Sequence, residues 1–310
     1  VYLGTTAADD VILYEKEADL PYSPGALVRV MVGAYAMKAI EEKSLDLDTV
    51  QGTYTLEMFN STIAGTGLGN CNMAFGETWT LRDLLTASMV TTAADAALTM
   101  AVAVAGSEAA FVAGMNELAA ELGCTGSHFT NVTGLHDPNQ VMTARDTVKI
   151  TRYAADYPAL RNMMELSQYS VNPVSKGSPR SWPASNELVR SVSPYYNANV
   201  VYGRTGFADD RYSVVAMGSK AGYEYMAVAL GAPKTGDGDK AGVHYRDVSR
   251  LLGWGFRDFS YKTLLRKNEP VGRIDVGLSW ETDAVALVPV ADFSTIVASG
   301  VDASQVIRVV

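Results

Sequence analysis

Cysteine and histidine are scarce in this chain of 310 residues, which contains two cysteines and three histidines. The cysteines, Cys71 and Cys124, lie far apart and lack the close spacing of metal-binding pairs. Two cysteines are too few for a disulfide framework, and their spacing excludes a cysteine-based zinc site. With His128, His136 and His244 as its histidines, the chain is short of parts for a histidine-based metal centre or charge relay. We therefore expect no metal and no cofactor.

Positive charge and long apolar segments are lacking as well. The chain has 25 lysines and arginines against 34 aspartates and glutamates, which gives a formal net charge of −9. No stripe of basic residues offsets this excess, so we expect neither a nucleic acid nor an anionic membrane surface as a partner. No apolar run reaches the ~18 residues that a membrane-spanning helix needs, and no signal peptide is visible. The sequence thus predicts no membrane span in this chain.

The rest of the composition, with 48% hydrophobic and 19% charged residues, is typical of a folded globular protein. Strand patterns near both ends enclose a helical middle, which predicts an α+β fold in which a sheet is flanked by helices. Short alternating strands follow from about residue 258, so we expect a second, small all-β domain there. The expected strands lie within 1–20, as a hairpin, and at 212–217 and 225–230; the expected helices begin at 24 and cover 84–105, 108–122, 143–164 and 243–252.

Short motifs follow one another from residue 24 to residue 256. They are Pro24–Met31, Gly76–Leu85, Thr92–Ala97, Phe111–Glu117, Glu121–Gly123, His128–Asn131, Gly134–Asn139, Thr143–Asp146, Tyr202–Gly206 and Leu252–Phe256. In this order and spacing, the set resembles the D-alanyl-D-alanine carboxypeptidases, the low-molecular-mass penicillin-binding proteins. The resemblance extends over nearly the whole chain.

The resemblance implies a β-lactamase/transpeptidase-like domain over residues 1–257, in which an antiparallel sheet is flanked by helices and joined to a helical subdomain. It also implies that residues 258–310 form a truncated start of the family's small β-rich C-terminal domain. Enzymes of this family remove the terminal D-alanine of peptidoglycan stem peptides by covalent acyl transfer. An extracytoplasmic location, in the cell envelope or secreted, follows from the resemblance alone.

The family's chemistry depends on three motifs, Ser-x-x-Lys, Ser-x-Asn and Lys-Thr-Gly. Matched by position, the nucleophilic serine falls on Ala26 and the lysine on Arg29. Alanine has no nucleophilic atom, and an arginine stays protonated at neutral pH and so is no general base. No lysine in the chain has a serine or threonine three residues before it, so a Ser-x-x-Lys motif occurs nowhere else either.

The other two motifs are altered too. The second falls on Thr92-Ala93-Ala94, which keeps a hydroxyl at Thr92 but loses the substrate-binding amide at Ala94. The third falls on Arg204-Thr205-Gly206, which keeps the positive charge and the glycine, and these three residues are the predicted substrate-binding residues. A literal Lys234-Thr235-Gly236 lies among turn-forming residues, and we interpret it as a polar turn.

Two interpretations of the arginines stay open. Arg29 either fills the space of the lysine and neutralises a nearby carboxylate, or joins Arg204 in a cationic cleft for a peptide carboxylate. Three hypotheses for function follow. The chain is an inactive homologue that binds peptidoglycan stem peptides, or a scaffold that binds an envelope protein and has a vestigial, filled cleft, or an active hydrolase that uses other residues such as Thr92.

Overall fold

The computed structural model describes residues 1–6, 11–175, 177–234, 242–277 and 283–302. The chain divides into two compact units, residues 1–252 and residues 253–310. The predicted division into a transpeptidase-like domain at 1–257 and a β-rich domain at 258–310 stays a prediction. The two units are described separately below.

The first unit is built around a five-stranded antiparallel sheet with the order β2-β1-β9-β8-β7. The N-terminal hairpin, β1 (Tyr2–Thr5) and β2 (Ile12–Glu15), pairs with the C-terminal strands, because β1 lies antiparallel to β9 (Tyr223–Pro233). β8 (Arg211–Lys220) joins β9 to the edge strand β7 (Val200–Ala208). The predicted union of strands from both ends of the chain in one sheet is confirmed.

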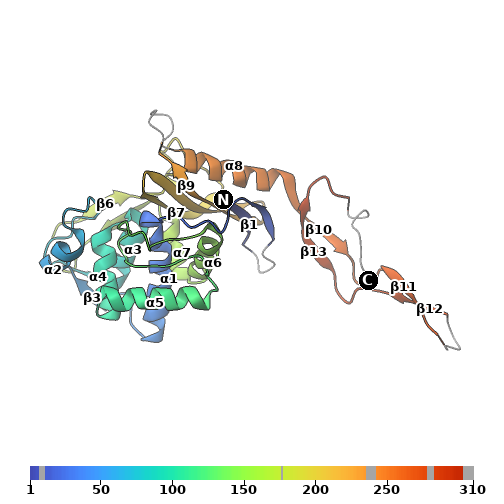
Figure 1. The fold of residues 1–310 in the computed structure, drawn as a ribbon, viewed down its shortest axis with the longest axis horizontal. Coiled ribbons are helices and arrows are strands. Elements are labelled where there is room, and N and C mark those ends of the chain that lie inside the picture. The colour runs from blue at the N-terminus through green and yellow to red at the C-terminus, as the bar shows by residue number, and fades with distance from the viewer. Residues whose placement is uncertain (7–10, 176, 235–241, 278–282, 303–310) are drawn as a thin grey trace. The chain divides into compact units, whose positions relative to one another are not determined.

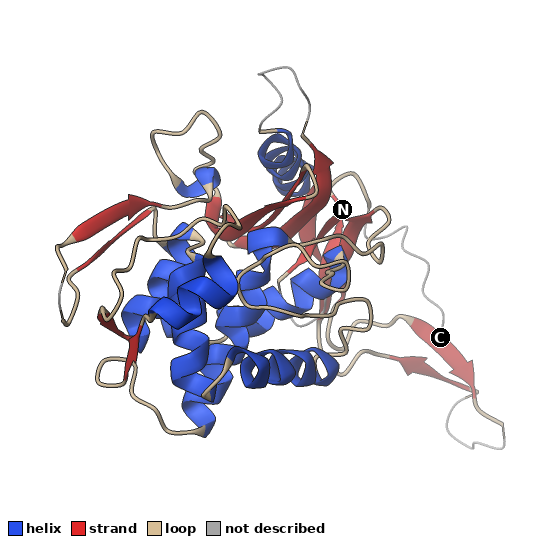
Figure 2. Cartoon of the chain, turned by 60° about the vertical axis from the view of Figure 1, so that its left-hand side comes forward, coloured by secondary structure: helices blue, strands red, loops and turns tan. Residues whose placement is uncertain are grey.

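Most helices cover one face of this sheet, and α8 (Val243–Asp258) begins on the other face (Figures 1 and 2). The central helix α1 (Arg29–Glu42) is preceded by the helical turn η1 (Gly25–Val28) and is buried nearly all round, as its sequence predicts. Its neighbours include α3 (Leu81–Thr91), α4 (Ala94–Ala105), α5 (Glu108–Glu121), α6 (Ala144–Ala155) and α7 (Pro158–Glu165).

Short elements complete the first unit. They are α2 (Leu56–Met58), η2 (Phe59–Ile63), η3 (Glu187–Val189), the pair β3 (Gln51–Thr53) and β4 (Thr78–Thr80), and the pair β5 (Gln168–Val171) and β6 (Arg180–Pro183). In the second unit, β10 (Phe259–Leu265) pairs with β13 (Phe293–Ala298), and β11 (Gly272–Asp275) pairs with β12 (Ala284–Leu287). The α+β fold with an additional small β-rich part is as predicted.

Two helices predicted as continuous are each broken into two. The helix expected over 84–105 ends at Thr91, because Thr92 adopts a left-handed conformation with φ of 59°. The helix expected over 143–164 ends before Pro158, which starts α7 and has no amide hydrogen to continue the preceding helix. Both predictions of an unbroken helix were wrong, and the first break falls within a predicted site motif.

The described helices were compared with the length and hydropathy of a membrane-spanning helix. No single helix there is both long and apolar enough to cross a membrane, although α4 and α5, which meet at a bend of 84°, pass together by length and composition. Most residues of α4 are buried in the core of the first unit.

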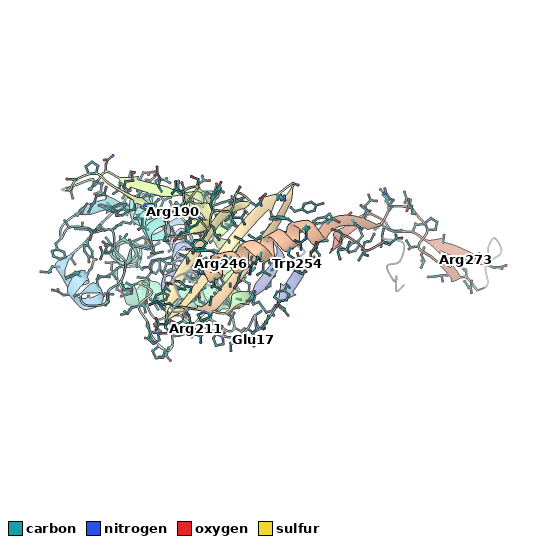
Figure 3. All side chains as sticks on the ribbon, turned by 90° about the horizontal axis from the view of Figure 1, so that it is seen from above. Glu17, Arg190, Arg211, Arg246, Trp254 and Arg273 are labelled. Carbon is teal, nitrogen blue, oxygen red and sulfur yellow. The ribbon has the colours of Figure 1, made fainter. Side chains whose placement is uncertain are left out.

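α8 packs on the outer face of the sheet through a buried histidine. His244 is 2% exposed, stacks on Tyr212 of β8 with a centroid distance of 4.7 Å and an interplanar angle of 3°, and contacts Tyr245. Neither of its ring nitrogens has a hydrogen-bond partner among the described residues. Burial lowers the pKa of His244 to about 4. Figure 3 shows this part of α8, with Arg246, lying across the strands.

We predict that His244 makes the stability of the first unit pH-dependent. Its pKa in the folded state lies below the unfolded value of 6.5, so the unfolded state binds more protons between pH 4 and 6.5. The free energy of unfolding should therefore rise with pH across this window, by up to about 3 kcal/mol from this group. His244→Phe should remove that part, and His128→Gln, at an exposed position, should retain it. Urea denaturation at pH 4.5 and 7 measures the difference; equal pH dependence of wild type and His244→Phe would contradict it.

Candidate active site

The structure brings the three predicted motif segments together at the start of α1. The guanidinium of Arg29 lies 3.5 Å from the carbonyl oxygen of Thr92, at the junction of α3 and α4. The backbone of η1 contacts β7 at Gly206. Segments separated by more than a hundred residues thus meet at one place, as an acyl-transfer site assembled from three motifs requires.

Backbone-to-backbone packing holds η1 against β7. A Cβ atom on Gly206 would lie 2.1 Å from the carbonyl oxygen of Pro24 and 2.5 Å from the amide nitrogen of Leu27. A Cβ atom on Gly25, which has a φ of 51°, would lie 2.3 Å from the carbonyl oxygen of Phe207. Both positions therefore require glycine, because backbone atoms on the opposite segment leave no room to move. Ala26, between these contacts, is held beside β7.

A further glycine, Gly134, lies against η1 from the loop that contains Asn131. A Cβ atom on Gly134, at a φ of 72°, would lie 2.6 Å from the carbonyl oxygen of Gly25. The Asn131 side chain shapes this loop, since its Oδ1 accepts the amide of Gly134 at 2.8 Å. Gln140 supports it by accepting the amides of residues 130 and 131. Gly134 was quoted among the sequence motifs, but its contact with Gly25 was not predicted.

Ala26 offers no reactive group at the position predicted for the nucleophile. Its side chain is half-buried, and a methyl group neither attacks a carbonyl carbon nor donates a hydrogen bond. The close approaches at Gly25 and Gly206 nevertheless hold the backbone on either side of it in place.

Arg29 is fully buried and donates its hydrogen bonds to carbonyl oxygens. Its Nη1 donates to Val132, and its Nη2 donates to Thr133 at 2.8 Å. Burial lowers the pKa of Arg29 to about 10, against the opposing effect of the Asp95 and Glu108 charges. The guanidinium thus remains protonated at neutral pH. Its hydrogen bonds connect α1 to the α3–α4 junction and to the 132–133 loop.

Thr92 and Ala94 both hydrogen-bond to main-chain carbonyl oxygens. The Thr92 hydroxyl donates to the carbonyl of Thr91 at 2.6 Å, in the left-handed turn that separates the two helices. Ala94 is fully buried at the start of α4, and its amide donates to the carbonyl of Gly69 at 2.8 Å. The hydroxyl that remains in this motif, that of Thr92, therefore uses its hydrogen atom in a bond to the neighbouring main-chain carbonyl.

Arg204 is directed into the core and binds the end of α7. It is 1% exposed, and its Nη1 and Nη2 donate to the carbonyls of Met164 and Met163, each at 3.3 Å. A cation is favourable at a helix C-terminus, where carbonyl groups lack intrahelical donors. Burial lowers the pKa of Arg204 to about 9. Met163 and Met164 were not predicted as its partners, because every residue has a main-chain carbonyl and the residue type does not show which carbonyl accepts a hydrogen bond.

Thr205 lies on the other face of β7 from Arg204, as strand alternation requires. Its hydroxyl donates to the carbonyl of Ser213 in β8 at 3.1 Å. The side chains of Arg204 and Thr205, both predicted to bind substrate, thus point to opposite faces, and each hydrogen-bonds to the main chain. Lys234 is exposed and the remainder of the predicted polar turn, residues 235 and 236, lies outside the described residues.

A group of side chains that could bind a metal ion was also sought in the described part of the chain. Among the residues that the structure describes, no three histidine, cysteine, aspartate or glutamate side chains are grouped to hold an ion.

The fold is that of penicillin-binding proteins and related transpeptidases. It is similar to a structure of penicillin-binding protein 3 from Streptococcus pneumoniae, with a TM-score of 0.76 and 21% identity, covering 96% of this chain and 84% of that one. It is also similar to the Streptomyces K15 DD-transpeptidase, with a TM-score of 0.71 and 22% identity, covering 82% of this chain and 95% of that one.

The family follows from the sequence comparison. A model of the D-alanyl-D-alanine carboxypeptidase family matches residues 4–234, and the chain therefore belongs to this family. It is 29% identical to the D-alanyl-D-alanine carboxypeptidase DacC of Escherichia coli K12 over 264 residues, which are 84% of this chain. It is 23% identical to DacF of Bacillus subtilis over 267 residues, or 86% of this chain. The match spans 61% of DacC and 64% of DacF.

We predict that Gly206→Ala destabilises the first unit by about 2–3 kcal/mol, since the added methyl group collides with backbone atoms of η1. Gly69→Ala is the matched control, because its Cβ would lie no closer than 4.0 Å to Thr92. Chemical denaturation of both variants measures the difference. Equal stability of the two would show that η1 and β7 are not packed as described.

Proposed function

We propose that this chain is a catalytically inactive homologue of the D-alanyl-D-alanine carboxypeptidases that acts in peptidoglycan metabolism by binding rather than by hydrolysis. The observation that carries the proposal is the pair Ala26 and Arg29, at the positions predicted for the nucleophile and its base. Acyl transfer needs a nucleophile and a group that takes its proton. A methyl group and a protonated arginine bonded to carbonyls supply neither.

The surroundings of the pair support the same conclusion. In serine acyl-transfer enzymes of this kind the second and third motifs assist proton transfer and hold the substrate. Here the Thr92 hydroxyl is engaged with Thr91, and Arg204 and Thr205 are engaged with main-chain carbonyls. The third hypothesis, an active hydrolase that uses Thr92, is less favoured, because the Thr92 hydroxyl donates to the Thr91 carbonyl and the described residues show no base hydrogen-bonded to it.

Between the two binding hypotheses, the geometry favours the scaffold with a vestigial cleft. That hypothesis expects the interior of the site to be filled, and Arg29 ties three segments together there. The stem-peptide hypothesis expects a free cation for the peptide carboxylate, whereas Arg204 is buried against α7. The proposed partner is therefore a cell-envelope protein recognised outside the vestigial cleft, in an extracytoplasmic compartment.

We predict that the chain forms no covalent adduct with a labelled penicillin, and that Ala26→Ser forms none either. The single change restores a hydroxyl but leaves Arg29, with a pKa of about 10, unable to accept its proton at pH 7. Intact-mass measurement after incubation tests both proteins, with a family member that carries Ser-x-x-Lys as positive control. An adduct on the wild-type chain would overturn the inactive assignment, and one on Ala26→Ser alone would place the base elsewhere.

A second prediction separates the two binding hypotheses. A peptide that ends in D-Ala-D-Ala should leave the amide NMR signals of residues 204–207 unchanged at millimolar concentration, because the cationic and hydroxyl groups there are occupied. The same peptide with a C-terminal amide is the control for carboxylate recognition. Shifts at these residues with the free acid and not with the amide would establish stem-peptide binding and refute the vestigial cleft.

A further inference from the structure

A small pocket opens beside the α3–α4 junction, outside the predicted catalytic motifs. Its walls come from β3–η2 and from the loop before β4, and Asp95 of α4 lies at its base. Its volume is about 120 Å³, below the range of about 300–1,000 Å³ that encloses a drug-sized ligand. A ligand would therefore lie across the pocket with one group or one ring inserted. None of the three motifs accounts for this feature.

Three aromatic rings form the apolar part of the pocket. Phe75 is 51% exposed, and its ring centroid lies 5.5 Å from that of Phe59 and 5.9 Å from that of Tyr54. Tyr54 is buried beneath it, at 2% exposure. A single exposed phenylalanine is unremarkable, but one supported by two rings at a pocket mouth offers a rigid apolar face to a ligand.

Two asparagines add polar groups beside these rings. Asn70 and Asn72 both line the pocket with exposed side chains, and the side-chain carboxamide of Asn72 makes no hydrogen bond within the part of the chain that the structure describes. A carboxamide both donates and accepts hydrogen bonds, which suits hydroxyl and acetamido groups.

The backbone that carries the asparagines is held in place. The amides of Cys71 and Met73 each donate to the carboxylate of Asp95 at 3.0 Å, and the amide of Asn72 donates to Asn70 Oδ1 at 3.1 Å. Arg180 donates to the carbonyl of Asn72. With three of its amides and the carbonyl of Asn72 hydrogen-bonded, this loop is pre-organised, which lowers the entropic cost of binding.

The charge of the pocket favours a neutral ligand. Asp95 is the charged side chain in its lining, it is 1% exposed, and both of its oxygens accept backbone amides. The groups left to contact a ligand are the aromatic face and the asparagine carboxamides. They suit a ligand with apolar C–H groups on one face and hydroxyl or acetamido groups at its edge. Sugar rings combine these two surfaces, because their axial C–H groups gather on one face and their polar groups lie at the edge.

We propose that this pocket, formed by Tyr54, Phe59, Phe75, Asn70 and Asn72 above Asp95, is a saccharide-binding subsite that takes one sugar ring stacked on Phe75. It does not rest on the proposed function, since the pocket uses none of the residues at issue there. It lies next to the predicted second motif, because Asp95 follows Ala94 directly and the carbonyl of Gly69 accepts the Ala94 amide. We expect binding in the range of about 1 mM, given the small volume enclosed.

The test is an NMR titration of the whole chain with tri-N-acetylchitotriose and with maltotriose. At least one of the two sugars should shift the amide signals of residues 70–75. Phe75→Ala should weaken binding about tenfold through the lost ring contact. Asn72→Gly should weaken it about fivefold, and glycine suits the left-handed φ of 55° at this position. Leu56→Ala is the matched control, since Leu56 is equally exposed at 51% and lies outside the pocket lining, and it should bind as the wild type does.

The alternative occupant is an aromatic or aliphatic peptide side chain, for which N-acetylphenylalanine amide is the probe. Shifts at residues 70–75 with this probe and with neither sugar would overturn the proposal. So would sugar binding that both Phe75→Ala and Asn72→Gly leave unchanged. Amide spectra of the variants outside the loop report whether the fold is kept, and if Phe75→Ala alters them, Asn72→Gly decides.

Discussion

The arrangement of this site depends on the close approach of the η1 backbone to β7 on one side and to the Asn131 loop on the other. Three glycines, Gly25, Gly134 and Gly206, permit it, because a side chain at any of them would collide with main-chain atoms of the opposite segment. Main-chain atoms cannot move aside without shifting a whole segment, so these contacts fix the position of η1 between β7 and the Asn131 loop. The start of α1, and with it Ala26 and Arg29, takes its place from this contact. The arrangement is thus determined by backbone packing and does not depend on the side chain of Ala26.

The burial of two arginines, Arg29 and Arg204, costs desolvation free energy in this arrangement. Taking a guanidinium out of water is unfavourable unless its donors are satisfied, and the lowered pKa values of Arg29 and Arg204 reflect this cost. Hydrogen bonds to main-chain carbonyl oxygens offset this cost. Arg29 donates to carbonyls of the 132–133 loop, and Arg204 donates to carbonyls at the end of α7. The Nε of both arginines stays without a partner among the described residues. Because their carbonyl partners are fixed by the fold, both arginines stabilise tertiary contacts and are not available to a substrate.

The sequence was sufficient for the fold class and for the family, and less so for the direction of side chains. Alternating strands at both ends and apolar helices between them predict the sheet and its helical cover, and these predictions are confirmed. The break at Thr92 was missed because its left-handed conformation depends on tertiary contacts of the junction, not on a glycine or proline at that point. Arg204 was expected at a cleft because its charge is visible in the sequence, whereas the α7 carbonyls that bind it are not. The pocket at Phe75 was missed for a similar reason, since its residues come from several segments with no shared motif.

The loss of polar groups from the predicted catalytic positions has a consistent physical effect. A serine and an asparagine in a buried site each need hydrogen-bond partners, and alanine at residues 26 and 94 removes that need. Functional groups of this kind are commonly retained at a cost to stability, and alanine at these two positions does not carry that cost. The surface beside the junction has the opposite character, since the 70–73 loop is held rigid by Asp95 while it exposes Asn72 and Phe75 to solvent. Recognition requires exposed and pre-organised groups, and in this unit they lie next to the predicted second motif instead of within it.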